Sequence, residues 1–170
     1  MRIIKQIQRL LEEKDCSFAY DPNLMAFDAS FPIKNTLLSI IIQIDNKRRL
    51  LVCDVLCPLK ILPHRKSAFS KLVMRVNKSF EFGRWILHDS CILTSRVIVN
   101  INRADIDDKF LEIAIFNNAC LMDWLIPAIS TLLYTECTPS EALAVLIEDK
   151  DVDQDTNPTS RFDFDYYSEN

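Results

Sequence analysis

The spacing of hydrophobic residues along this chain switches between a helical and a strand period. Between residues 3 and 11, and again between 69 and 80, apolar side chains recur at intervals of three, four and seven residues. This spacing places them on one face of a helix. The pattern predicts an amphipathic helix at the N-terminus and a second over about residues 63–79.

A period of two, typical of strands, dominates the segments around that second helix. Residues 36–45 form the clearest case, because Leu38, Ile40, Ile42 and Ile44 share one face. The turn residues that follow predict a hairpin with residues 49–56. Similar patterns predict an edge hairpin over residues 18–31 and another hairpin over residues 82–101.

The C-terminal part of the chain returns to helical patterns. Acidic residues before position 110 favour a helix start, and the apolar residues 110–119 follow them. A further helix is expected over about 123–134, with Pro127 near its start or kinking it. A last helix is marked by Thr138-Pro139-Ser140-Glu141, which has the spacing of a capping box.

This order of elements predicts an α+β fold, in which an antiparallel sheet of about five strands packs against helices. We expect one domain over residues 1–147 and an acidic, aromatic-containing C-terminal tail over residues 148–170. The tail carries a net charge of −6, whereas the remaining 147 residues carry +2. The nearly neutral body argues against nucleic-acid binding, which needs clustered basic residues. The two basic clusters, Lys47-Arg48-Arg49 and Arg65-Lys66, are interpreted as a solvated turn and a solvated helix start.

Composition excludes several classes of chemistry. Gly83 is the only glycine, so glycine-rich phosphate loops, dinucleotide fingerprints and nucleophile elbows are ruled out. The longest apolar segment is interrupted by Asp123 and Pro127, and the N-terminus lacks the pattern of a signal peptide. We therefore expect a cytoplasmic protein with no membrane contact.

The six cysteines predict neither a disulfide framework nor a metal site. Cys53 and Cys57 lie in a strand-like run, where four residues span about 13 Å, and a disulfide tolerates only about 7 Å. Paired Cys-x-x-Cys motifs are absent from the sequence, and only two histidines are present. No cofactor is expected.

One stretch of the sequence resembles a known family. Residues 72–77 (Leu-Val-Met-Arg-Val-Asn) end the second helix, and residues 82–87 (Phe-Gly-Arg-Trp-Ile-Leu) open the next strand. An asparagine near a helix end, followed by a glycine and an aromatic residue opening a strand, recurs in the YbjN-like family of sensory transduction regulators. That family is similar in fold to the class I type III secretion chaperones. A second stretch, Trp124 to Leu143, resembles the family's C-terminal region.

The resemblance covers residues 1–147 by element order and implies a protein-binding module that forms a homodimer and has no catalytic residues. Related chaperones hold extended client segments against apolar grooves and exposed strand edges. The first hypothesis is therefore a non-enzymatic, chaperone-like or regulatory protein with a protein partner. A dedicated secretion chaperone for an effector is the alternative within this class.

A thiol-dependent enzyme or redox-sensitive protein is the alternative from another class. Cys57 and His64 lie seven residues apart across a proline-bounded loop, and His88 is followed by Asp89. Nucleophilic catalysis requires such groups within hydrogen-bond reach. We interpret these four residues as structural or solvated rather than catalytic.

Two further sets of residues are candidates for protein contact. Trp85 and Trp124 have apolar neighbours, which favours core packing over partner binding. In the tail, aromatic and acidic residues alternate with the period of a strand, and the candidate binding residues are Phe162, Phe164, Tyr166 and Tyr167. Two interpretations stay open: the tail adds to a sheet edge, its own or a partner's, or it is a disordered, solubilising end.

Overall fold

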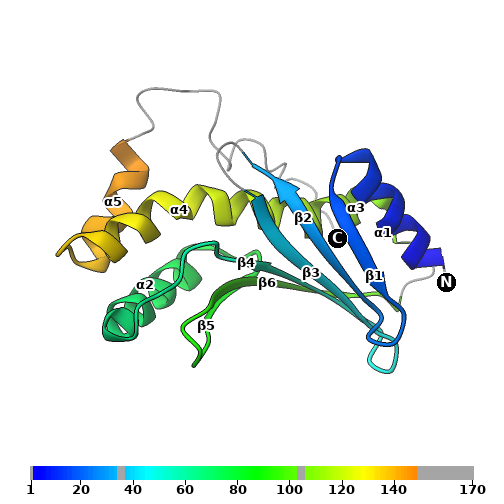
Figure 1. Cartoon of the computed structure of the whole chain (residues 1–170), viewed down its shortest axis with the longest axis horizontal. Helices are drawn as coiled ribbons and strands as arrows, with labels where there is room; N and C mark the ends of the chain where they lie inside the picture. The colour runs from blue at the N-terminus through cyan, green and yellow to red at the C-terminus, as the bar shows by residue number, and fades with distance from the viewer. Residues whose placement is uncertain (1, 34–36, 103–105, 149–170) are drawn as a thin grey trace.

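The computed structural model describes residues 2–33, 37–102 and 106–148 (Figure 1). Six strands form one antiparallel sheet, in the order β1-β2-β3-β4-β6-β5. They are β1 (Ser17–Asp21), β2 (Ala26–Pro32), β3 (Leu37–Asp45), β4 (Leu50–Leu56), β5 (Arg84–Leu87) and β6 (Leu93–Asn100). The α+β class and the antiparallel sheet are confirmed. The sheet has six strands rather than about five, because both strands of the N-terminal hairpin extend it beyond β3.

Helices occupy the positions that the periodicity predicts, with one exception. They are α1 (Arg2–Glu13), a short 3-10 turn η1 (Pro63–Arg65), α2 (Lys66–Ser79), α3 (Asp108–Glu112), a π-helical segment η2 (Ile113–Asn117), α4 (Asn118–Tyr134) and α5 (Pro139–Glu148). The exception is the pair of helices expected over 110–119 and 123–134. They form one continuous helical run, and Pro127 lies inside α4 rather than at a helix start.

The hydrophobic core lies between one face of the sheet and the helices. Side chains alternate along β3, where Leu38, Ile40, Ile42 and Ile44 are buried and their neighbours are exposed. Figure 1 shows α1, α3 and α4 on this side of the sheet, with α2 and α5 gathered at one end of the molecule. The predicted apolar face of β3 is therefore the core face.

The helical run Asp108–Tyr134 is the centre of this layer. Its 27 residues are long and apolar enough to cross a membrane by length and composition alone, and 56% of its most apolar window is buried inside the protein. In the structure α4 packs against β4, β6 and α5. Apolar side chains of this run therefore pack in the core of the protein.

The predicted capping box at the start of α5 is formed as expected. The backbone N–H of Thr138 donates to Oε2 of Glu141 at 2.7 Å, and the N–H of Glu141 donates to Oγ1 of Thr138 at 3.3 Å. These bonds satisfy backbone donors that a helix start leaves free. Hydrogen bonding of the Glu141 carboxylate by Thr138, chiefly through the backbone N–H, lowers the pKa of Glu141 from its ordinary value.

Candidate protein-binding surfaces

The face of the sheet that points away from α4 carries the main candidate site, which we call the outer sheet face. Alternation along each strand turns every second side chain toward it. Three of its large apolar residues are exposed: Leu37 by 61%, Ile41 by 39% and Ile98 by 57%. Leu37 and Ile41 lie on β3 and Ile98 on β6, so apolar surface is spread across the middle of the sheet. In the part of the chain that the structure describes, no helix lies across this face (Figure 1).

A row of charges crosses the outer sheet face from strand to strand. Registers place Asp28 of β2 beside Ile41, Ile41 beside Asp54 of β4, and Asp54 beside Arg96 of β6. Arg84 of β5 lies beside Arg96 at the end of the row. One half of the face is therefore acidic and the other half basic, and Ile41 lies in the acidic half.

The two charges in the middle of this row neutralise each other. Arg96 donates to both carboxylate oxygens of Asp54, through Nε at 2.7 Å and Nη2 at 2.8 Å. Both side chains are half-buried, and the hydrogen bonds to Asp54 raise the pKa of Arg96 above its usual range. This pair is not predictable from the sequence, because the pairing of β4 with β6 joins strands separated by a helix and another strand. Asp28 and Arg84, both exposed, are left at the two ends of the row.

The β5 edge of the sheet is closed by a side chain from α2. Asn77 Oδ1 accepts a hydrogen bond from the backbone N–H of Trp85 at 2.8 Å, and its Nδ2 donates to the carbonyl of the same residue at 3.0 Å. These are the backbone groups of Trp85 that an added strand would need, because its neighbours Arg84 and Ile86 face β6. Helix α2 also packs along this strand. A peptide cannot extend the sheet here without displacing Asn77.

The opposite edge of the sheet, on β1, has backbone groups that point outward. The bond from the N–H of Ile44 to the carbonyl of Met25 shows which residues of β2 face β3. By alternation, the backbone groups of Phe18 and Tyr20 in β1 point away from β2, toward the edge. One residue of this edge strand, Asp21, is acidic, and it is exposed. The β1 edge is the one that can accept an extended segment from another protein.

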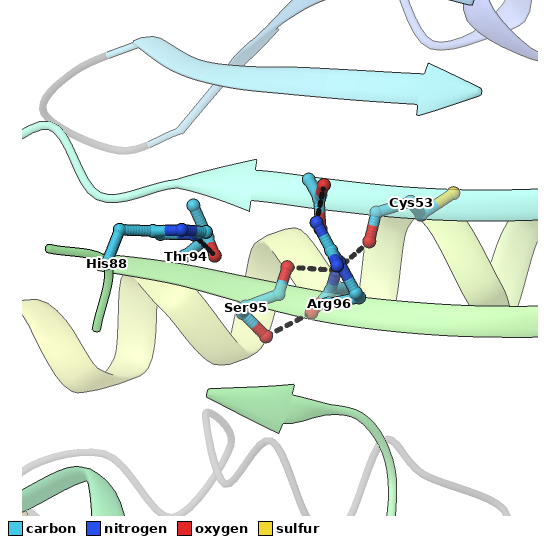
Figure 2. A network of polar contacts seen from close by, with 7 residues as sticks. Cys53, His88, Thr94, Ser95 and Arg96 are labelled. Carbon is cyan, nitrogen blue, oxygen red and sulfur yellow. Dashed lines mark hydrogen bonds and ion pairs between the residues drawn. The ribbon is translucent and has the colours of Figure 1, made fainter. Parts of the chain in front are cut away.

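A buried polar network holds α4 against the strands that carry the charged row (Figure 2). Asn118, fully buried at the start of α4, donates through Nδ2 to the carbonyls of Ser95 at 3.0 Å and Cys53 at 3.3 Å. The hydroxyl of Ser95 donates to Oδ1 of Asn118. Asn118 was not among the residues predicted from the sequence, although the polar pair at 117–118 inside an otherwise apolar run is a signal for it. Its role is to position β4 and β6, since every polar atom of its amide is occupied.

The thiol and imidazole singled out by the sequence do not come together. Cys57 is half-buried just after β4, and burial raises the pKa of its thiol to about 11. His64 lies in η1 and is exposed. Among the described residues, neither side chain is hydrogen-bonded to the other. A thiol with so high a pKa is a poor nucleophile at neutral pH.

His88 and Asp89 also turn to different partners. His88 Nε2 lies 2.9 Å from Oγ1 of Thr94 (Figure 2), whereas the carboxylate of Asp89 accepts a hydrogen bond from Lys66 at 2.8 Å. Lys66 lowers the pKa of Asp89, and Asp89 raises that of Lys66. Within the described ranges, no group of three or more His, Cys, Asp or Glu side chains is placed to hold a metal ion.

The two tryptophans are placed in different ways. Trp85 is buried in the core, whereas Trp124 is half-buried and packs edge-on against Phe80, with ring centroids 5.3 Å apart. The candidate tail residues Phe162, Phe164, Tyr166 and Tyr167 lie outside the described residues.

Comparison with known proteins gave no relative. No family model matches the chain, and neither the curated proteins nor the solved structures contain a match.

Proposed function

We propose that this chain is a non-enzymatic protein-binding module, chaperone-like or regulatory, that acts as a homodimer in the cytoplasm. The observation that carries the proposal is the outer sheet face, which exposes apolar residues within both its acidic half and its basic half. All six cysteines are free thiols, which supports a reducing compartment. A chaperone dedicated to one secreted effector is the narrower form of the same proposal.

The second copy of this chain is the occupant that we assign to the outer sheet face. A homodimer with two-fold symmetry brings the same surface of both copies together. If the symmetry axis runs parallel to the strands and close to β4, the strand order of the partner copy is reversed. Asp28 of one copy then faces the half of the other that carries Arg84, while Ile41 and Ile98 become buried. An axis across the strands would place like charges opposite each other and is disfavoured.

A partner protein is assigned to the β1 edge. The backbone groups of Phe18 and Tyr20 point outward there, so that an extended segment can add to the sheet by main-chain hydrogen bonds. The exposed carboxylate of Asp21 at this edge favours a neutral or basic segment. The β5 edge is unsuitable because Asn77 occupies it.

The dimer is tested by light scattering of the full-length chain, whose mass is 19.7 kDa. We expect a particle of twice this mass at micromolar concentration. Ile98→Asp places a charge in the middle of the outer sheet face and is expected to give monomers. Leu24→Asp, a matched change at an exposed leucine in the β1–β2 turn, is expected to leave the dimer intact.

Charge complementarity has its own test. Asp28→Arg and Arg84→Asp should each weaken the dimer, and the two changes together should restore part of the lost affinity. A monomeric wild-type protein, or a dimer that tolerates Ile98→Asp, would refute the assignment of this face.

The protein-binding role is tested at the β1 edge. Main-chain pairing is blocked by proline, so Tyr20→Pro should abolish capture of a partner in a pull-down, whereas Ala19→Pro alters a residue whose backbone faces β2 and should unfold the hairpin. Circular dichroism separates these two effects. A partner that is retained by folded Tyr20→Pro protein would show that the β1 edge is not used.

A further inference from the structure

Helix α2 lies in the most basic part of the chain. Residues 55–80 contain six lysines and arginines and no acidic residue. Four of the six lie within α2 itself. This positive charge therefore belongs to helix α2 and to the segment that precedes it.

Three of these basic residues share one exposed side of α2. Lys71, Met74, Arg75 and Lys78 are spaced by three, four and seven residues, which places them along one helical stripe. All four are exposed, Met74 by 56%. We call this stripe the basic face of α2. The residues of α2 that are buried in the core are Phe69, Leu72 and Val76.

The charges of the basic face are not balanced within the described part of the chain. Lys71, Arg75 and Lys78 form no ion pair with any described acidic residue. By contrast, Arg65 is paired with Glu136 at 3.3 Å, and Lys66 with Asp89 at 2.8 Å. The basic residues nearest the start of α2 are satisfied, while those along its exposed side are available to an acidic ligand.

We infer that the C-terminal segment 149–170 docks on the basic face of α2 of the same chain. From residue 148 onward the chain has eight acidic residues and two basic ones. Its aromatic residues Phe162 and Phe164 alternate with Asp163 and Asp165, a sequence pattern that would give an extended segment one apolar and one anionic side. Met74 offers the aromatic rings a polarisable contact between the cationic side chains.

The position of α5 supports docking within one chain. Helix α5 ends at Glu148 and packs against α2 at the same end of the molecule (Figure 1). An extended chain advances about 3.3–3.6 Å per residue, so residue 162 can lie as far as about 45 Å from residue 148. Helix α2, with 14 residues, is about 21 Å long. The segment can reach every part of the basic face.

Other surfaces suit this segment less well. The β1 edge carries the acidic Asp21 and no basic residue, so it offers an acidic segment no charge partner, and the β5 edge is occupied by Asn77. The other basic cluster lies in the turn between β3 and β4, which Figure 1 shows at the far end of the sheet from α5. There, Arg48 already interacts with Asp45.

Photo-crosslinking of the full-length protein tests the inference. Phe164 is replaced by p-benzoylphenylalanine, which reacts preferentially with methionine, and the crosslinked peptides are identified by mass spectrometry. We expect the main crosslink at Met74. The triple variant Lys71→Glu/Arg75→Glu/Lys78→Glu should lower its yield by about tenfold or more. A matched triple variant at exposed lysines elsewhere, Lys5→Glu/Lys47→Glu/Lys109→Glu, should leave the yield unchanged.

Two controls define the outcome. Mixing probe-bearing chains with isotope-labelled chains that lack the probe shows whether the crosslink lies within one chain, as expected, or between chains. Repeating the reaction with Ile98→Asp separates this inference from the proposed dimer, because docking within one chain should survive loss of the outer-face contact. Crosslinks that lie between chains, fall mainly on β1 or the β3–β4 turn, or resist the α2 triple variant would overturn the inference.

Discussion

The side chain of Asn77 forms hydrogen bonds to both backbone groups of Trp85, at 2.8 and 3.0 Å, and so takes the place of a neighbouring strand. An edge strand with free backbone groups is a site of unwanted pairing, and proteins usually cover it. Here a single amide from the last turns of α2 does so. The same contact fixes α2 beside β5 and sets the direction in which the basic face of α2 points.

Asn77→Ala is expected to destabilise the fold and to expose the β5 edge. Loss of two hydrogen bonds to half-buried backbone groups costs about 1–3 kcal/mol in the free energy of unfolding. Urea denaturation followed by circular dichroism measures this loss. Asn102→Ala, at an exposed asparagine, should change stability by less than about 0.5 kcal/mol. Equal midpoints for the two variants would contradict the role assigned to Asn77.

Gly83 precedes β5 and is predicted to resist substitution. Its φ angle is +79°, and a Cβ atom there would lie 3.3 Å from the carbonyl oxygen of Arg96 and from Cγ2 of Val97. We expect Gly83→Ala to lower the free energy of unfolding by about 1–2 kcal/mol. Gly83→Asn should cost less if the left-handed backbone dominates, because asparagine tolerates that conformation better. If the free energy of unfolding of Gly83→Ala equals that of the unsubstituted protein, the turn adjusts to accommodate the added Cβ atom, and the prediction is wrong.

These two residues show how far the sequence could be interpreted. The resemblance singled out Asn77 and Gly83 by their order along the chain, but not the bonds that explain them. Helices and strands were predictable because their periods are local properties of the sequence. The charged row from Asp28 to Arg84 could not be predicted, because it depends on which strands become neighbours and in which register they pair.

The continuous helix over Asp108–Tyr134 was missed for a related reason. Periodicity analysis assumes 3.6 residues per turn, whereas the π-helical segment Ile113–Asn117 interrupts that period in the middle of the run. Directly after this segment, Asn118 faces the sheet. The sequence pattern suggested two helices with a break at residues 120–122, whereas in the structure the wider turn lies at 113–117 and the helix continues through the predicted break.

Asn118→Leu is expected to destabilise the protein although it keeps a similar side-chain volume. The change removes bonds to the carbonyls of Cys53 and Ser95 and leaves the buried hydroxyl of Ser95 without its acceptor. A loss of about 2–4 kcal/mol in the free energy of unfolding is expected. The double variant Asn118→Leu/Ser95→Ala should recover part of the lost free energy of unfolding, because it removes the buried hydroxyl that has no acceptor. Thermal denaturation of the single and double variants measures the recovery, and a double variant less stable than Asn118→Leu would argue against the network.

The buried thiols predict a loss of stability at alkaline pH. Burial raises the pKa of Cys57 to about 11, and that of Cys53 further, whereas an unfolded cysteine titrates near 8.5. Between about pH 8.5 and 11 the unfolded chain therefore loses thiol protons that the folded chain retains, so the free energy of unfolding falls as pH rises. Each such thiol contributes a slope of at most about 1.4 kcal/mol per pH unit.

Cys57→Ala removes one buried thiol and should reduce the slope of the free energy of unfolding against pH by up to about 1.4 kcal/mol per pH unit. Cys120→Ala, at an exposed cysteine, serves as the comparison and should change the slope less. Urea denaturation at a series of pH values from 7.5 to about 10.5 measures both. Alkylation gives a second readout: at pH 8, iodoacetamide should label Cys120 well before Cys57, and Cys53 only on unfolding. Rapid labelling of Cys57 in the folded protein at pH 8, with an unchanged slope in Cys57→Ala, would show that this thiol is ionised. That result would favour the alternative of a thiol-dependent enzyme or redox-sensitive protein.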